Sequence, residues 1–302
     1  MALPTSKPPV LIIAYNRPST LEKLFKSLEN SWNYDQNSFV IVHQVGNRVT
    51  AKAIEDFLSR NSNSILIQIN GSQRSSTENI SFNRHLGLKF CFETLSAEYV
   101  VALEDDVEVS IDIFNFTKFI MRKYSKNRNF RGINYGSFEP HGDQSSLYYS
   151  KVRFGIHGPA STITKMTWKS LNVPRVREKL TRLDWDGVFE YFCKTGFMIT
   201  PENSRFLDIG YNGTHAPGLS DPYFHKMASS FVGGGKIAEN ATYKFRKINH
   251  SWREDAVVYN RIDNWKYYLI WFCNSRNRYY VFSKLERALY RLLILKRLRK
   301  LN

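Results

Sequence analysis

Uninterrupted apolar runs alternate with amphipathic segments along the first third of the sequence, and this pattern constrains the fold more than any other feature. The first run, residues 9–15, is typical of a strand buried on both faces of a parallel sheet. Residues 16–18 break it, and Ser19 or Thr20 is placed to cap a helix whose apolar residues recur at helical spacing. The start of the chain therefore predicts a strand, a loop and a helix.

The same alternation repeats three more times. Further strands are predicted at residues 39–43, 64–69 and 98–103, and further helices at 51–60 and 79–95. Four such units in succession favour an open α/β sheet with right-handed crossovers. Past residue 110 the alternation weakens, with helices expected at 111–124 and 185–195 and a glycine-rich loop at 211–235.

Polar residues follow three of the predicted strands where ligands bind in open α/β sheets, at the carboxyl ends. The candidates for holding a ligand there are Ala14, Tyr15, Asn16, Arg17 and His43. The fourth strand ends in Glu104-Asp105-Asp106. Adjacent carboxylates at the end of a buried strand repel one another, and a divalent cation offsets that repulsion. Mn²⁺ or Mg²⁺ held by one or two carboxylates leaves positions for phosphate oxygens, which suits a nucleoside diphosphate.

Four ordered landmarks extend this pattern. They are residues 99–110 around the acidic triplet, Trp185-Asp186, the segment 201–205 (PENSR) and the segment 210–215 (GYNGTH). Their order and spacing resemble the N-acetylglucosaminyltransferase I family, glycosyltransferase family 13, over roughly residues 9–216. The resemblance implies a GT-A fold, a Rossmann-like open mixed sheet flanked by helices. It also implies inverting transfer from a nucleotide sugar, with UDP-N-acetylglucosamine as the leading donor.

The resemblance also implies roles for single residues. Asp106 would ligate Mn²⁺, and Glu104 and Asp105 would contact the sugar nucleotide. Asp186 would be the general base and Trp185 a wall of the sugar pocket. Inverting transfer needs a base on the face opposite the leaving group, and Asp184 is an alternative to Asp186. His215, in the glycine-rich loop, is a further candidate for contacting the diphosphate or the metal.

The net charge of +16 is concentrated at the end of the chain. From Arg276 onward there are nine basic residues and one acidic residue, Glu286. From Ser283 the apolar residues form one helical stripe beside basic ones, which predicts a basic amphipathic helix that binds an anionic membrane surface. We therefore expect a GT-A domain over 1–260, with a donor half at about 9–110 and an acceptor half at 111–260. Residues 261–302 would be an aromatic and basic membrane-associating tail.

The sequence also bears on the cellular location of the protein and on two alternative functions. Three widely spaced cysteines favour a reducing compartment, and the first nine residues lack the apolar core of an export signal. A cytoplasmic enzyme on the inner face of the cell membrane is expected, building surface polysaccharide or lipopolysaccharide on a glycan or lipid-linked saccharide acceptor, with no nucleic acid partner. A basic RNA-binding protein would explain the charge but not the acidic triplet. A sugar nucleotidyltransferase would need a glycine-rich phosphate loop, and residues 14–18 contain no glycine.

Overall fold

The computed structural model describes residues 7–70, 76–137, 147–152, 159–171, 196–210, 228, 231–233 and 237–246. The elements in chain order are β1 (Pro9–Ala14), α1 (Pro18–Glu29), η1 (Tyr34–Gln36), β2 (Ser38–Gln44), α2 (Arg48–Arg60), β3 (Ser64–Ile69), α3 (Ser76–Lys89), η2 (Phe90–Thr94), β4 (Tyr99–Glu104), β5 (Val107–Val109), α4 (Ile113–Tyr124), β6 (Phe130–Asn134), β7 (Tyr148–Val152), β8 (Ala160–Thr164), α5 (Lys165–Leu171), β9 (Phe197–Pro201), β10 (Phe206–Asp208) and β11 (Lys244–Phe245). The predicted helix at 185–195 and the predicted tail at 261–302 lie outside these residues.

The described strands form one large open sheet and one small ribbon. The large sheet has the order β11-β7-β9-β6-β8-β4-β1-β2-β3, and β5 pairs with β10 in the ribbon. β1 runs parallel to β2 and β4, whereas β8 is inserted antiparallel between β4 and β6. The sheet is therefore mixed, and the predicted open mixed α/β architecture flanked by helices is confirmed.

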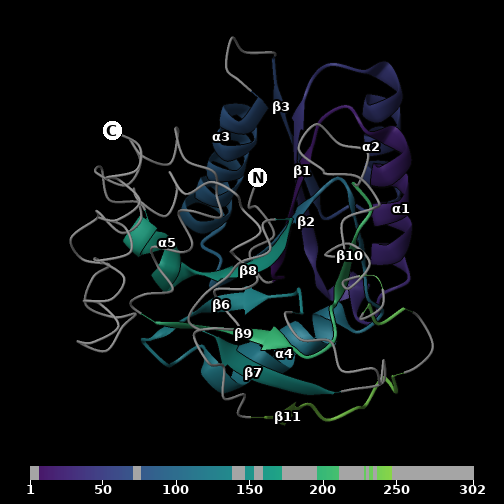
Figure 1. Cartoon of the computed structure of the whole chain (residues 1–302). Coiled ribbons are helices and arrows are strands. Elements are labelled where there is room, and N and C mark those ends of the chain that lie inside the picture. Colours follow the sequence, from purple (N-terminus) through teal and green to yellow (C-terminus); the bar gives the residue numbers. More distant parts are fainter. Residues whose placement is uncertain are drawn as a thin grey trace, which may run out of the picture. The chain divides into compact units, whose positions relative to one another are not determined.

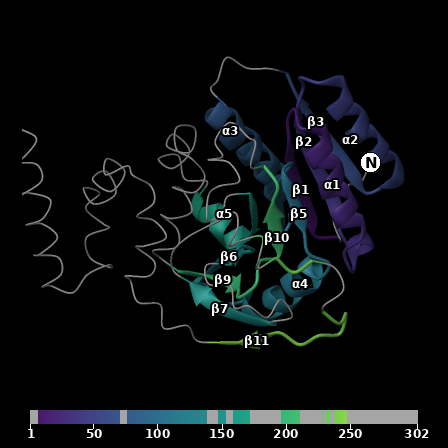
Figure 2. The same cartoon turned by 45° about the vertical axis from the view of Figure 1, so that its right-hand side comes forward.

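Helices cover both faces of the sheet, with α1 and α2 on one side and α3 on the other (Figures 1 and 2). One core cluster joins the sheet to α1, α2 and α4, and a second joins it to α3, η2 and α5. β1 and β2 are buried along their whole length. That burial on both faces explains why these strands read as continuous apolar runs.

The start of α1 differs from the prediction. The helix begins at Pro18, with Arg17 at the N-cap position and no side-chain capping bond, so the predicted cap at Ser19 or Thr20 is wrong. Proline favours the first helical position because its φ is already helical and its missing N–H has no partner to lose there. The consequence is that Arg17 lies at the junction of strand and helix.

Among the described residues, no helix combines the length and apolar character that crossing a membrane requires.

Candidate active site

Three loops that the sequence analysis singled out lie together at one edge of the large sheet. β1 lies between β2 and β4, with Ala14 opposite His43 and Ile13 opposite Glu104 (Figure 1). Because these strands are parallel, the segments 14–17, 43–46 and 104–106 leave the sheet side by side. The structure thus brings the acidic triplet next to the loop that carries Arg17.

Glu104 and Asp105 are each held by a partner from another element. Glu104 forms an ion pair with Arg84 of α3, 2.7 Å between Nη2 and Oε1, and Arg84 is almost completely buried. The backbone N–H of Tyr15 donates to Oδ2 of Asp105 over 2.8 Å. These contacts fix two of the three carboxylates to α3 and to the β1 loop.

Asp106 is the member of the triplet with an unsatisfied oxygen. Arg17 donates to its Oδ2, while its Oδ1 is buried and accepts no hydrogen bond from any described residue. The whole residue is only 7% exposed. Leaving a buried acceptor without a partner costs roughly 1–3 kcal/mol, and more for a charged group, so this oxygen is suited to a cation.

The segment after β10 lies directly against Asp106. The backbone N–H of Ile209 donates to the carbonyl oxygen of Asp106 over 2.8 Å, and the N–H of Gly210 donates to Oδ1 of Asp208 over 2.8 Å. A Cβ at Gly210 would lie 2.2 Å from Oδ2 of Asp106. Only glycine therefore allows the chain this close to the carboxylate.

Negative charge is crowded at this edge. Burial raises the pKa of Asp105 to about 7, and the charge of Asp106 adds to the rise, although the Tyr15 amide and Arg17 oppose it. Burial and then Asp106 likewise raise the pKa of Asp208 to about 7. The carboxylates repel one another here, and Arg17 is the cation that partly offsets them.

On the other side of the triplet, the loops after β1 and β2 touch. A Cβ at Gly46 would lie 2.8 Å from Oδ1 of Asn16, so the loops after β1 and β2 are in close contact at this point. Ala14 and His43 are buried, and burial lowers the pKa of His43. Tyr15 and Asn16 are exposed and Arg17 is partly exposed, so a ligand can reach these three members of the predicted donor-binding group.

Four predicted site residues, Asp184, Trp185, Asp186 and His215, lie outside the described residues. Their assignment as base, pocket wall and diphosphate contact stays a prediction.

Sequence reasoning missed two residues that contact or neighbour the triplet, Arg84 and Asp208, and it singled out Gly210 only as the first residue of the landmark 210–215. Arg84 gave no local signal, because its role depends on packing across elements. Asp208 had one, since an aspartate two residues before a glycine is a common local turn. That signal places a turn but gives no hint that it lies against the triplet.

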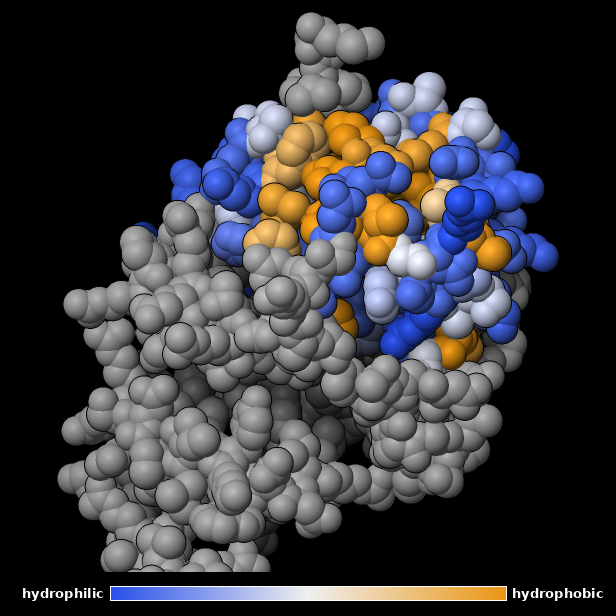
Figure 3. Space-filling model, turned by 90° about the horizontal axis from the view of Figure 1, so that it is seen from above, coloured by the Kyte–Doolittle hydropathy of each residue, from blue (hydrophilic) through white to orange (hydrophobic). Residues whose placement is uncertain are grey.

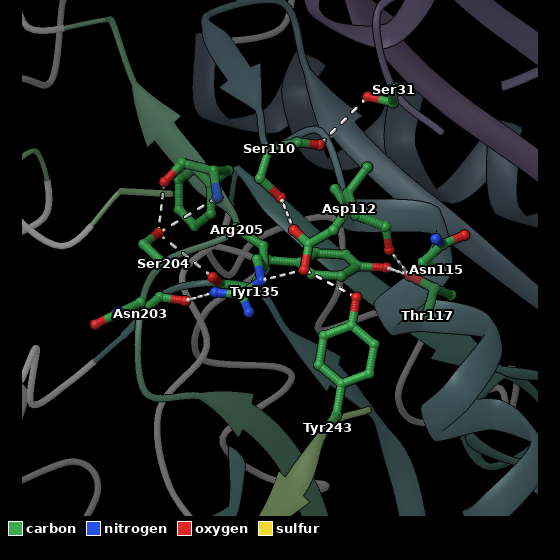
Figure 4. Close-up of polar contacts among 12 residues, drawn as sticks. Ser31, Ser110, Asp112, Asn115, Thr117, Tyr135, Asn203, Ser204, Arg205 and Tyr243 are labelled. Carbon is green, nitrogen blue, oxygen red and sulfur yellow. Dashed lines mark hydrogen bonds and ion pairs between the residues drawn. The ribbon is translucent and has the colours of Figure 1, made fainter. Parts of the chain in front are cut away.

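A buried polar network anchors the ribbon that carries Asp208 (Figure 4). Arg205 and Asp112, both completely buried, form an ion pair of 3.0 Å between Nε and Oδ2. Asp112 also accepts from the hydroxyls of Ser110 and Tyr243, over 2.8 and 2.9 Å. The backbone N–H of Ser110 donates to the carbonyl oxygen of Arg205 over 3.0 Å. The network therefore joins the chain after β5 to the start of β10, and explains why the segment 201–205 carries an arginine.

The donor atoms at this edge fit a divalent cation that is only partly held by protein. No group of three or more His, Cys, Asp or Glu side chains in the described part of the chain is arranged to hold a metal by itself. Mg²⁺ and Mn²⁺ are commonly held by one or two carboxylates and complete their shell with phosphate oxygens and water. The unsatisfied oxygen of Asp106 fits that arrangement.

The surface at the same end of the molecule is partly apolar. Figure 3 looks down on it and shows hydrophobic residues gathered in the middle of the described surface, with hydrophilic residues around them. Val45 of the β2–α2 connection is 44% exposed, Val49 in the first turn of α2 is 58% exposed, and Tyr15 is 50% exposed. Apolar surface beside a few convergent polar groups is typical of small-molecule sites.

No family model matches the chain, and no curated protein matches its sequence. Among solved structures it is similar to the mannosyltransferase PcManGT from Pyrobaculum calidifontis in complex with GDP-Man and Mn²⁺, at 15% identity and a TM-score of 0.45, over 67% of this chain and 57% of that one. It is also similar to GalNAc-T7 with UDP, GalNAc and Mn²⁺, at 13% identity and a TM-score of 0.49, over 66% of this chain and 42% of that one.

A third similar structure is the galactosyltransferase LgtC in complex with donor and acceptor sugar analogues, at 14% identity and a TM-score of 0.46. That match covers 74% of this chain and 83% of that one. The chain thus spans less than two thirds of the first two structures and most of the third.

Proposed function

We propose that the protein is an inverting, metal-dependent glycosyltransferase that moves a sugar from a nucleoside diphosphate to a glycan or lipid-linked saccharide. N-acetylglucosamine from UDP-N-acetylglucosamine is our first choice of donor. The observation that carries the proposal is the buried, unsatisfied oxygen of Asp106 at the carboxyl end of β4, beside Arg17 and the exposed loop after β1. A nucleoside diphosphate brings the phosphate oxygens that a cation on a single carboxylate lacks.

Asp106 and its neighbours would each bind a different part of the donor. Asp106 would hold Mn²⁺ or Mg²⁺, which when bound offsets the charge of the departing diphosphate. Arg17 now pairs with Asp106, so a cation at Asp106 would release its guanidinium toward the diphosphate. Tyr15 keeps Asp105 in place through its backbone N–H, and its exposed ring is available to the base or sugar.

Glu104 has a different role from Asp106. Its ion pair with the buried Arg84 already neutralises it, and removing either partner would leave a charge inside the protein. We therefore assign Glu104 to orienting the triplet and the donor, as its partner fixes its carboxylate to α3.

For the chemical step we propose Asp186 as the general base, with Asp184 as the alternative. The base takes the proton of the acceptor hydroxyl while its oxygen attacks C1 of the sugar from the face opposite the diphosphate, and the C1–O bond to the diphosphate breaks. Trp185 would form a wall of the sugar pocket, and His215 would contact the diphosphate.

We further propose that the protein works on the inner face of the cell membrane, in surface polysaccharide or lipopolysaccharide synthesis. The support is the basic amphipathic pattern after Ser283. Truncation after Phe282 should release the protein from phosphatidylglycerol vesicles, and salt should weaken the binding of the intact chain. Equal binding to neutral and anionic vesicles would contradict this part of the proposal.

A panel of nucleotide sugars, screened by thermal shift with and without Mn²⁺, tests the function. A donor should raise the melting temperature only when Mn²⁺ is present, because the cation would complete the site for the diphosphate and a ligand that binds only the folded state stabilises it. The product's anomeric configuration, read by NMR, tests inversion. No stabilisation by any nucleotide sugar, or retention of configuration, would refute the proposal.

A further inference from the structure

The ribbon of β5 and β10 places a second aspartate beside Asp106. The two strands pair antiparallel with Asp208 opposite Val107, the residue directly after Asp106. The next residue along, Ile209, donates its N–H to the carbonyl oxygen of Asp106 over 2.8 Å. Asp208 thus directly precedes the residue that hydrogen-bonds to Asp106, although Asp208 and Asp106 are far apart in sequence.

The turn at residues 208–210 lies closer to Asp106 than side-chain packing normally allows. Gly210 leaves no room for a Cβ over Oδ2 of Asp106, and its N–H fixes the carboxylate of Asp208 through Oδ1 over 2.8 Å. The turn therefore holds the Asp208 carboxylate in place with a backbone donor. A carboxylate held in this way is already ordered before any ligand arrives.

An independent observation points to a ligand at this place. Asp106 is more than nine-tenths buried, and its Oδ1 accepts no hydrogen bond from any described residue. Arg17 reaches only the other oxygen. A second carboxylate next to an unsatisfied anionic oxygen would be unfavourable without a cation that both can bind.

We propose that Asp208 supplies a second protein carboxylate to the divalent cation that Asp106 holds. This inference rests on the proposed function, because the cation is the one that the donor diphosphate completes. A cation shared by the two carboxylates would offset the repulsion between them.

The position of Asp208 also argues against a role as general base. It lies beside Asp106 and therefore on the side of the diphosphate, whereas an inverting base acts from the opposite face of the sugar. The carboxylate is held by Gly210 rather than directed at an acceptor.

The test measures Mn²⁺ affinity from the electron paramagnetic resonance signal of the free ion, with and without UDP. Asp208→Asn keeps an oxygen for the Gly210 N–H, so the turn should survive. Changes even around metal ligands typically cost about 10- to 100-fold in affinity, so losing Asp208 should weaken Mn²⁺ binding at least about 10-fold. Glu108→Gln removes the same charge from the opposite strand of the ribbon and should leave the affinity unchanged.

A second variant tests ligation directly. Asp208→Cys should gain a thiolate-to-metal charge-transfer band with Cd²⁺, because a thiolate binds soft metals, and Asp106→Asn should abolish that band. Glu108→Cys should show no such band. Wild-type Mn²⁺ affinity in Asp208→Asn, or no band in folded Asp208→Cys, would overturn the inference.

The two proposals fail in different ways. If Mn²⁺-dependent donor binding is the same in the wild type and in Asp208→Asn, the function stands and the role of Asp208 falls. If Asp208 affects Mn²⁺ affinity but no nucleotide sugar binds, the metal ligand stands and the glycosyltransferase proposal falls.

Discussion

The buried ion pair between Arg205 and Asp112 leads to a prediction about stability. Both side chains are completely buried, and their Nε–Oδ2 distance is 3.0 Å. Arg205→Met removes the guanidinium but keeps a long apolar side chain, so the buried carboxylate of Asp112 loses its cationic partner and keeps, among the described residues, the hydroxyls of Ser110 and Tyr243 as donors. An uncompensated buried charge of this kind costs about 3–5 kcal/mol of unfolding free energy.

The same substitution at an exposed pair is the matched control. Arg60 and Glu29 also form an ion pair of 3.0 Å, but the arginine side chain is 55% exposed. Exposed pairs contribute about 0–1 kcal/mol, so Arg60→Met should change the unfolding free energy by no more than that. The distance is equal in the two pairs, so the difference in cost reports the burial of Arg205 together with its bond to the carbonyl oxygen of Asn203.

Thermal and urea unfolding experiments measure the stability of both variants. For domains of about 150–250 residues, each kcal/mol shifts the melting temperature by about 2–4 °C. Arg205→Met should therefore melt about 6–20 °C lower than the wild type, and Arg60→Met at most about 4 °C lower. Two probes of unfolding should give coincident transitions, as expected for a two-state domain.

A double variant separates charge from packing. Arg205→Met combined with Asp112→Leu removes both charges, and replacing a buried pair by apolar residues is often close to neutral. The double variant should be more stable than the sum of the two single changes predicts. If Arg205→Met costs no more than Arg60→Met, the ion pair does not anchor the ribbon and the reasoning about β10 fails.

Three further predictions concern the site and the core. Asp186→Asn should keep donor affinity and lose about 10²-fold or more in turnover, and a dead Asp184→Asn beside an active Asp186→Asn would identify the other carboxylate as the base. Gly210→Ala should destabilise the protein by about 1–3 kcal/mol and weaken Mn²⁺ binding, because its Cβ would meet Asp106, whereas Gly233→Ala, with nothing within 4 Å, should do neither. Burial raises the pKa of the Cys91 thiol to about 12, so iodoacetamide at pH 8 should label it only after unfolding, as read by peptide mass spectrometry; rapid labelling of the native protein would contradict its burial.

Local patterns were enough to predict β1 to β4 and the helices between them. The apolar runs that became β1 and β2 are buried throughout, so their hydrophobicity was a direct signal of position in the sheet. The acidic triplet was also placed correctly at the end of β4, because a polar break after an apolar run marks the strand's carboxyl end.

Long-range partners could not be predicted in the same way. Glu104 pairs with Arg84 across 20 positions, and Asp112 pairs with Arg205 across 93. Such pairs depend on the register of strands and on helix packing, which no local pattern contains. The position of Asp208 beside Asp106 depends on the antiparallel pairing of β5 with β10, two short strands that no periodicity distinguishes from a loop.

Isothermal titration of UDP-N-acetylglucosamine into the intact protein, with Mn²⁺ or with EDTA, tests the central claim most directly. The wild type should bind the donor with Mn²⁺ and lose that binding in EDTA. Asp106→Asn should lose it in both, while Asp56→Asn, an exposed change on α2, should bind as the wild type does. Other UDP-sugars, titrated in the same way, cover the case of a different donor. Metal-independent binding, or full binding by Asp106→Asn, would contradict the account.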